Sequence, residues 1–111
     1  MAKRTTPPAS HLKVLIWDAR VKVYISKSML EDDKNWGEFD PDSKRIVIHP
    51  EVVSIKELLD TFCHETLHHV IPDFNETQID QCTKKVLHSL SAFERVRLVL
   101  KLAQSLQQVD I

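Results

Sequence analysis

The sequence predicts an α+β domain in which a small, mostly antiparallel sheet of three to four strands is followed by three helices. In the first half of the chain, short runs of β-branched and aromatic residues alternate with turn residues. In the second half, apolar residues recur at helical spacing behind two Ser-x-x-Glu capping boxes. The 111 residues suffice for one core. We therefore expect a single domain over residues 11–111, preceded by a disordered tail over residues 1–10.

The strands are expected between Leu12 and His49. Two apolar runs, LKVLIWDA from Leu12 and VKVYIS ending at Ser26, are separated by a short polar connection and predict two strands. A polar loop follows at residues 31–35. The stretch 36–49 then has the pattern of strand, turn and strand, with Asp-Pro-Asp-Ser in its centre. We expect this hairpin to lie at one edge of the sheet.

Three helices are expected in the second half, each with a start signal in the sequence. A capping box opens the first, over residues 55–71, and a proline ends it. An N-cap asparagine opens the second, over residues 76–90. A second capping box opens the third, which should run to about residue 109 and pack across the other helices. The apolar positions expected in that packing are Val96, Val99, Leu100, Leu102, Ala103 and Leu106.

Composition and charge argue against several classes of function. The formal net charge is −1 and no segment is heavily basic, so nucleic acid and anionic membranes gain no electrostatic support as partners. No apolar run approaches membrane-spanning length, and we find no apolar core of a secretory signal. We therefore expect a cytoplasmic protein. Its two cysteines, Cys63 and Cys82, form no C-x-x-C motif and should be buried free thiols.

The most informative stretch is HETLH, residues 64–68, an H-E-x-x-H pattern inside the first predicted helix. Histidines four residues apart lie on one face of a helix, so His64 and His68 can bind one divalent ion. Glu65 then lies beside a metal-bound water and can accept its proton. We predict that His64 and His68 are metal ligands and that Glu65 is the general base.

A third ligand is expected from the start of the second helix. The connection at residues 72–75 has the length of a helix hairpin, which brings Glu76 back near His68. Asp80, one turn further on, shares its face and can accept a hydrogen bond from a ligating histidine. Asp80 and then Asp73 are the alternatives to Glu76 as ligand. Two histidines, one carboxylate and an open position for water are typical of a catalytic Zn²⁺ site.

Plainer interpretations compete with this one. The two histidines could simply be hydrogen-bonded to Asp80 and water, with Glu65 exposed. Glu76 could be an acid placed at a helix N-terminus, where it interacts favourably with the helix dipole. His69 points about 100° away from His68 on the helix and should be a surface or supporting residue. His49, just before the first helix, could approach a bound substrate.

These residues resemble the gluzincin metallopeptidases, whose signature is H-E-x-x-H on one helix and N-E-x-x-x-D on the next. Residues 64–68 and 75–80 match the two halves. Size and layout look like the minigluzincins and the minimal zincin core of the ImmA/IrrE-type peptidases. The resemblance implies three zinc ligands, a glutamate that polarises water and an aspartate that supports a histidine. Carried over, these roles fall on His64, His68 and Glu76, on Glu65, and on Asp80.

The sequence thus predicts a zinc-dependent hydrolase, a metallopeptidase that cleaves a protein or peptide substrate through a Zn²⁺-activated water. An exposed strand edge of the 36–49 hairpin would hold the substrate extended by main-chain pairing. The alternative is a zinc-containing binding module that acts by docking a partner protein. A third possibility is a latent zincin whose metal is covered by the C-terminal residues 110–111.

Overall fold

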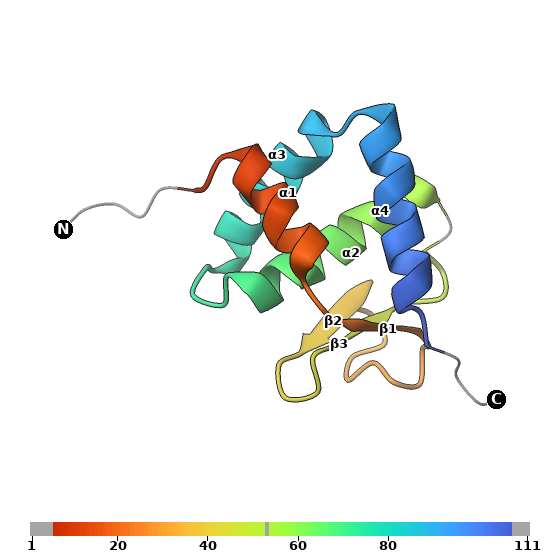
Figure 1. The fold of residues 1–111 in the computed structure, drawn as a ribbon. Coiled ribbons are helices and arrows are strands. Elements are labelled where there is room, and N and C mark those ends of the chain that lie inside the picture. The colour runs from red at the N-terminus through yellow and green to blue at the C-terminus, as the bar shows by residue number, and fades with distance from the viewer. Residues whose placement is uncertain (1–5, 53, 108–111) are drawn as a thin grey trace.

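The structure, a computed structural model, describes residues 6–52 and 54–107. In these residues the helices gather on one side of a small sheet (Figure 1). The α+β class is confirmed, with a three-stranded sheet followed by three helices and one further helix ahead of the sheet. The elements are α1 (Ala9–Asp18), β1 (Lys22–Ile25), β2 (Gly37–Asp40), β3 (Arg45–Ile48), α2 (Ile55–Val70), α3 (Glu76–Ser89) and α4 (Ala92–Ser105).

Helix α1 contradicts the strand predicted from Leu12. Its buried residues include Leu12 and Ile16, which are four apart, a helical spacing. In so short an apolar run a helix and a strand leave overlapping patterns, and the β-branched residues favoured the wrong one. Packing decides the conformation here, because α1 lies against α2 and α3 and buries this stripe between them. Residues 1–5 of the predicted tail lie outside the described residues, and Ala9 and Ser10 already belong to α1.

The sheet is mixed rather than mostly antiparallel. Its order is β1-β3-β2, with β1 parallel and β2 antiparallel to β3. The predicted hairpin is confirmed: β2 and β3 pair through a tight turn in which Lys44 has a positive φ of 55°. Strand β1 joins β3 instead of a strand before it, because the segment before it is helical. As expected, β2 is the edge strand.

Each helix of the second half begins at a predicted cap, but the capping box predicted at Ser54 has only one of its two hydrogen bonds. The Ser54 hydroxyl accepts a hydrogen bond from the Glu57 N–H at 3.1 Å, and α2 ends just before Pro72. Asn75 caps α3 through a reciprocal capping box, and Ser91 does the same for α4. The turn between α2 and α3 is short, so these two helices pack side by side.

Helix α4 departs from its prediction in length and in its packing face. It ends at Ser105, before the predicted residue 109, which lies outside the described residues. Leu106 then forms a parallel bridge to Val23, so the chain returns beside β1. Leu98 and Leu102 are the residues that α4 buries. Val99 is only partly buried. The other residues that were expected in the packing and are instead exposed are Val96, Leu100, Ala103 and Leu106.

One hydrophobic core lies among the helices and the sheet of the described residues: α2 and α4 contact the strands, and α1 and α3 pack on α2. Full burial of an aliphatic or aromatic side chain contributes about 1.5–3 kcal/mol to folding, and α2 supplies several such residues. Both cysteines are buried and free, as predicted. No helix over the described residues is long and apolar enough to cross a membrane. Fully buried core residues include Leu12, Ile16, Ile46, Phe62, Leu67 and Ile79.

Candidate metal centre

Helix α2 separates its candidate metal ligands from its core side chains. Phe62, Cys63 and Leu67 are fully buried, and this orientation turns His64 and His68 toward the boundary between core and solvent. The histidine side chains are 18% and 23% exposed. Their ring centroids are 4.9 Å apart. The two imidazoles therefore lie close together on one face of α2, as expected for residues four positions apart in a helix.

Glu76 meets both histidines from the next helix. Its Oε2 lies 3.1 Å from His64 Nε2, and its Oε1 lies 2.5 Å from His68 Nε2. Glu76 is the first residue of α3, and the Asn75 capping box orients the helix at this point. The helix hairpin thus brings together the carboxylate and the two imidazoles.

These three side chains form a group that could hold a metal ion. Their nearest ligand atoms all lie within 4.8 Å of one another. In a tetrahedral Zn²⁺ site with bonds of about 2.0–2.2 Å, neighbouring ligand atoms are about 3.3–3.6 Å apart. Rotation of the Glu76 side chain, which is 70% exposed, can supply the small adjustment. Imidazole nitrogens and a carboxylate are a donor set that suits Zn²⁺, so the residues present fit the ion.

Asp80 lies behind this group. Its Oδ1 is 3.1 Å from His64 Nδ1, so one histidine contacts carboxylates of α3 at both ring nitrogens. A ligating histidine commonly donates its other ring N–H to such a carboxylate, which selects the tautomer with a free Nε2. Asp80 is thus placed to orient His64. It is not one of the three residues in the group that could hold a metal ion.

Glu65 faces the same region from a more enclosed position. It is only 9% exposed, in contrast to Glu76. Burial is the main cause that raises the pKa of its carboxyl to about 7. The carboxylates of Glu76 and Glu38 also raise this pKa, whereas the charge of His64 lowers it. A divalent ion held by the neighbouring histidines would act in the opposite direction and favour the carboxylate.

Two adjoining clefts meet at Glu65. They have volumes of about 580 and 670 Å³ and share Asn35, Gly37, His64 and Glu65 along their common boundary. One continues past Phe39 and Asp40 of β2, so the edge strand borders the candidate metal centre. An extended segment of another chain could lie along this border.

Gly37 allows β2 to approach α2 this closely. A Cβ atom at Gly37 would lie 2.5 Å from Thr61 Cγ2 and 3.4 Å from Glu65 Cγ. The first distance is shorter than any real contact, so a larger residue here would require either the Thr61 side chain or the strand to shift. The only glycine of the chain therefore stands where the edge strand passes the candidate metal centre.

Glu38 is a further carboxylate in the cleft beside this group, and it was not among the predicted site residues. This carboxylate of β2 accepts hydrogen bonds from the Glu31 N–H at 2.6 Å, the Asp32 N–H at 3.0 Å and Asn35 Nδ2 at 2.8 Å. Although partial burial raises its pKa, these hydrogen bonds bring the pKa below its usual value. Glu38 thus ties the 31–35 loop to the strand. The sequence feature that could have indicated this role is a carboxylate in a predicted edge strand that follows a polar loop with several N–H donors.

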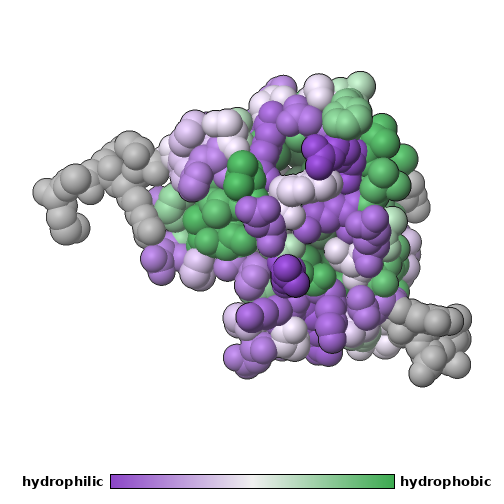
Figure 2. Space-filling model, viewed as in Figure 1, coloured by the Kyte–Doolittle hydropathy of each residue, from purple (hydrophilic) through white to green (hydrophobic). Residues whose placement is uncertain are grey.

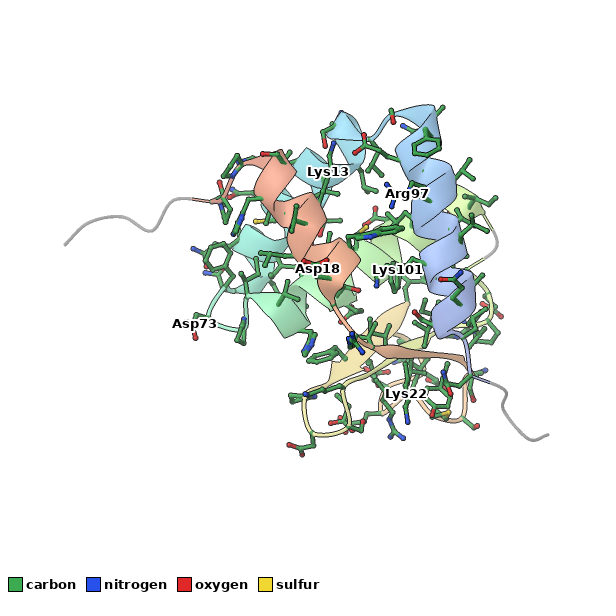
Figure 3. The ribbon with its side chains drawn as sticks, viewed as in Figure 1. Lys13, Asp18, Lys22, Asp73, Arg97 and Lys101 are labelled. Carbon is green, nitrogen blue, oxygen red and sulfur yellow. The ribbon has the colours of Figure 1, made fainter. Side chains whose placement is uncertain are left out.

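Other histidines and acids lie apart from the group. His49 is buried against Trp36, with ring centroids 5.5 Å apart, and its Nδ1 accepts from the Glu51 N–H; it lines neither cleft. His69 packs on Phe39 at 5.1 Å between centroids. Asp73, labelled in Figure 3 in the turn after α2, is not in the ligand group. Residues 110–111, expected as a cover in the latent alternative, lie outside the described residues.

The fold and site together define a small α+β protein in which a helix hairpin carries a His/His/Glu group that could hold a metal ion. The spacing of the two histidines is compatible with the H-E-x-x-H pattern. Comparisons with family models, with curated protein sequences and with solved structures give no match for this chain.

Proposed function

We propose that the protein is a zinc-dependent peptidase of gluzincin type. The observation that carries the proposal is the meeting of His64, His68 and Glu76 at one point, with Glu65 beside them at the junction of two clefts. A bound Zn²⁺ would supply a Lewis acid that lowers the pKa of water and polarises a carbonyl oxygen. The protein itself carries out the remaining steps: proton transfer, orientation of a ligand and binding of the substrate.

Glu65 acts as the general base in this mechanism. Its carboxylate borders both clefts, so a water molecule beside the ligand group lies within its reach. It accepts the proton of the attacking water and delivers it to the amine that leaves when the peptide bond breaks. Its burial limits competition from bulk solvent. Asp80 keeps His64 oriented throughout this cycle through its contact with Nδ1.

Strand β2 positions the substrate. It is the terminal strand of the sheet, so one side of its backbone does not pair with another strand. An extended peptide can add to such an edge through main-chain hydrogen bonds. Gly37 holds the strand close to Glu65, which sets the distance between the bound peptide and the general base.

The cleft walls favour a basic substrate. The larger cleft contains Glu51, Glu57 and Asp60, while Arg45 in the other is the one Lys or Arg side chain that lines either cleft. A wall of one sign attracts the opposite charge and raises its local concentration. Lysine and arginine side chains flanking the scissile bond should therefore bind best.

The variant Glu65→Gln tests the proposal. It is compared with the wild type and with Asp42→Asn, which makes the same carboxyl-to-amide change in the exposed hairpin turn. Zinc content by mass spectrometry and cleavage of unfolded casein are measured for each protein. We expect Glu65→Gln to retain one zinc per chain and lose cleavage, and Asp42→Asn to retain both. Wild-type cleavage should stop with a chelator and return with zinc. Full activity in Glu65→Gln would remove the general-base assignment, and a zinc-loaded wild type without cleavage would remove the peptidase proposal.

A second candidate function is a metal-containing module that binds a partner protein. One observation favours it, namely an exposed apolar surface on α1 and α4 that lies away from the clefts. Zinc would then stabilise the helix hairpin, and the zinc-loaded wild type would hydrolyse no peptide in the experiment above.

A further inference from the structure

Helix α4 has two apolar faces, but only one of them is buried. Leu98 and Leu102 face the core, whereas Phe93, Val96 and Leu100 are 69%, 59% and 55% exposed. The spacing of the exposed three, at positions i, i+3 and i+7, places them in one stripe along the helix. Isolated exposed apolar residues are ordinary, but a continuous stripe indicates an interaction site.

Two further exposed apolar residues lie on α1. Val14 and Trp17 are 54% and 40% exposed. The Arg97 guanidinium bridges the two helices, since it lies 4.2 Å from the Trp17 ring centroid and 5.7 Å from that of Phe93. In Figure 2 green residues follow the edge of the molecule over α4, and a hollow opens between α4 and α1. We call this the α1–α4 surface; it consists of Val14, Trp17, Phe93, Val96, Arg97 and Leu100.

A cleft of about 290 Å³ opens in this surface. Ile16, Val86, Leu90 and Leu98 give it an apolar floor, and none of its lining residues lines the clefts at the candidate metal centre. Its volume lies at the lower limit for small-molecule sites, which run from about 300 to 1,000 Å³. It is large enough for a single bulky apolar side chain. A small ligand in this cleft would leave Phe93, Val96 and Leu100 exposed, because these residues do not line it.

The charged rim of the cleft leaves one cation available. Figure 3 shows Lys13 and Asp18 of α1 on one side and Arg97 of α4 on the other. Lys13 pairs with Glu94 at 3.0 Å. Across residues 6–52 and 54–107, no carboxylate lies within ion-pair distance of Arg97. Its stacking on Trp17 orients the planar guanidinium and leaves its N–H groups for a carboxylate from outside.

Charge also decides between a second copy and a different partner. Two copies joined through the α1–α4 surface would bring Arg97 of one copy, with Lys101 close by, toward the same basic side chains of the other copy. Like charges facing each other across an interface are unfavourable. A different partner that carries carboxylates next to its own apolar residues could contact the apolar residues of the α1–α4 surface and pair with Arg97 at the same time. Exposed tryptophan and arginine in contact are also the residue types that dominate binding energy at protein interfaces.

We propose that the α1–α4 surface binds an acidic amphipathic segment of a partner protein. A large apolar side chain of that segment enters the cleft, and a neighbouring carboxylate binds the Arg97 guanidinium. The groove between two helices suits a helical segment, whose anchors recur at i, i+3 or i+4, and i+7. The proposal is independent of the peptidase function, because the two sites share no residue.

Selection of peptides from a random 12-residue phage library tests the proposal. The target is the full zinc-loaded chain carrying Glu65→Gln, so that bound peptides are not cut. We expect the selected peptides to combine Asp or Glu with Trp, Phe or Leu. Arg97→Glu should weaken their binding at least tenfold by fluorescence anisotropy, as should Leu100→Glu. Lys84→Glu, the same charge reversal at an exposed site of α3, should leave it unchanged.

A charge swap separates a direct contact from a damaged fold. Peptides in which Lys replaces the acidic residues should bind Arg97→Glu better than they bind the parent chain. Arg97→Glu should still show the helical circular dichroism of the parent and a cooperative thermal transition. Selection of peptides without acidic residues, or equal binding to Arg97→Glu, would overturn the proposal. So would an empty selection. A dimer in sedimentation experiments that Leu100→Glu dissociates would show instead that the surface receives a second copy.

Discussion

Asp80 Oδ1 lies 3.1 Å from His64 Nδ1, while the other ring nitrogen of His64 lies 3.1 Å from Glu76 Oε2. Both acids belong to α3, one turn apart, and His64 belongs to α2. The His64 imidazole on α2 is therefore held between two carboxylates of α3. Such an arrangement fixes the ring plane before any ion is bound.

Asp80→Asn should weaken zinc binding without removing it. The amide keeps the shape of the side chain but loses the charge that supports the Nδ1–H tautomer of His64. Loss of such a supporting partner typically costs about 10–100-fold in metal affinity. Competition with a chromogenic chelator gives the dissociation constant, with Asp42→Asn as control. His64→Ala and His68→Ala should abolish stoichiometric binding, and an Asp80→Asn affinity equal to that of the wild type would contradict the role of Asp80.

Gly37→Ala should destabilise the fold by forcing β2 away from α2. The new methyl group would lie 2.5 Å from Thr61 Cγ2, and overpacking of this kind costs about 1–3 kcal/mol. The φ of Gly37 is not positive, so the cost comes from the contact alone. Urea denaturation measures the free energy of unfolding. Thr61→Ser removes Cγ2, and the double variant Gly37→Ala/Thr61→Ser should recover most of the loss; no recovery would place the strain elsewhere.

Cleavage should depend on the charge of the substrate. Matched fluorogenic peptides that differ only in Lys or Glu around the scissile bond should show a higher kcat/KM for the Lys series. The carboxylates of Glu51, Glu57 and Asp60 would attract the basic side chains. Raising the salt concentration should narrow the difference, because exposed charges are screened. Glu57→Lys with Asp60→Lys should reverse the order, and an unchanged preference in that variant would show that the cleft charge is not used.

The Lys13–Glu94 ion pair should give a pH-dependent contribution to stability. The N–H of Ser91 and the Lys13 ammonium hold the pKa of Glu94 below its ordinary value of 4.5. A carboxyl group whose pKa is lower in the folded state stabilises the fold above its unfolded-state pKa, and loses that effect as pH falls through the folded-state pKa. The thermal midpoints of wild type and Glu94→Gln should thus differ near neutral pH and converge below pH 4.5. Parallel midpoints at all pH values would contradict the shift.

Local signals explain why the helical half was predicted well. Asn75 and Ser91 cap α3 and α4 through hydrogen bonds to residues three positions away, so the signal lies within one turn of sequence. Pro72 ends α2 for an equally local reason. The H-E-x-x-H spacing likewise places His64 and His68 on one face of any helix that contains them. The ligand roles of these residues stay predictions until metal is measured.

Contacts between distant segments explain the errors. Whether the run from Leu12 is helix or strand depends on α2 and α3, which follow it by some forty residues or more and bury Leu12 and Ile16 together. The parallel pairing of β1 with β3 also depends on a partner outside its own sequence. Leu98, and not Leu100, faces the core because the orientation of α4 is set by the elements that it packs against.

The helix caps, the β2–β3 hairpin and the spacing of the two histidines follow from local sequence, because each depends on residues within a few positions of one another. The packing of the elements settled that Gly37 brings the edge strand against α2, and that Phe93 and Leu100 face outward. These relations join segments that are distant in the chain. They are set by which surfaces bury the most apolar area when the elements pack, a quantity that no short stretch of sequence contains.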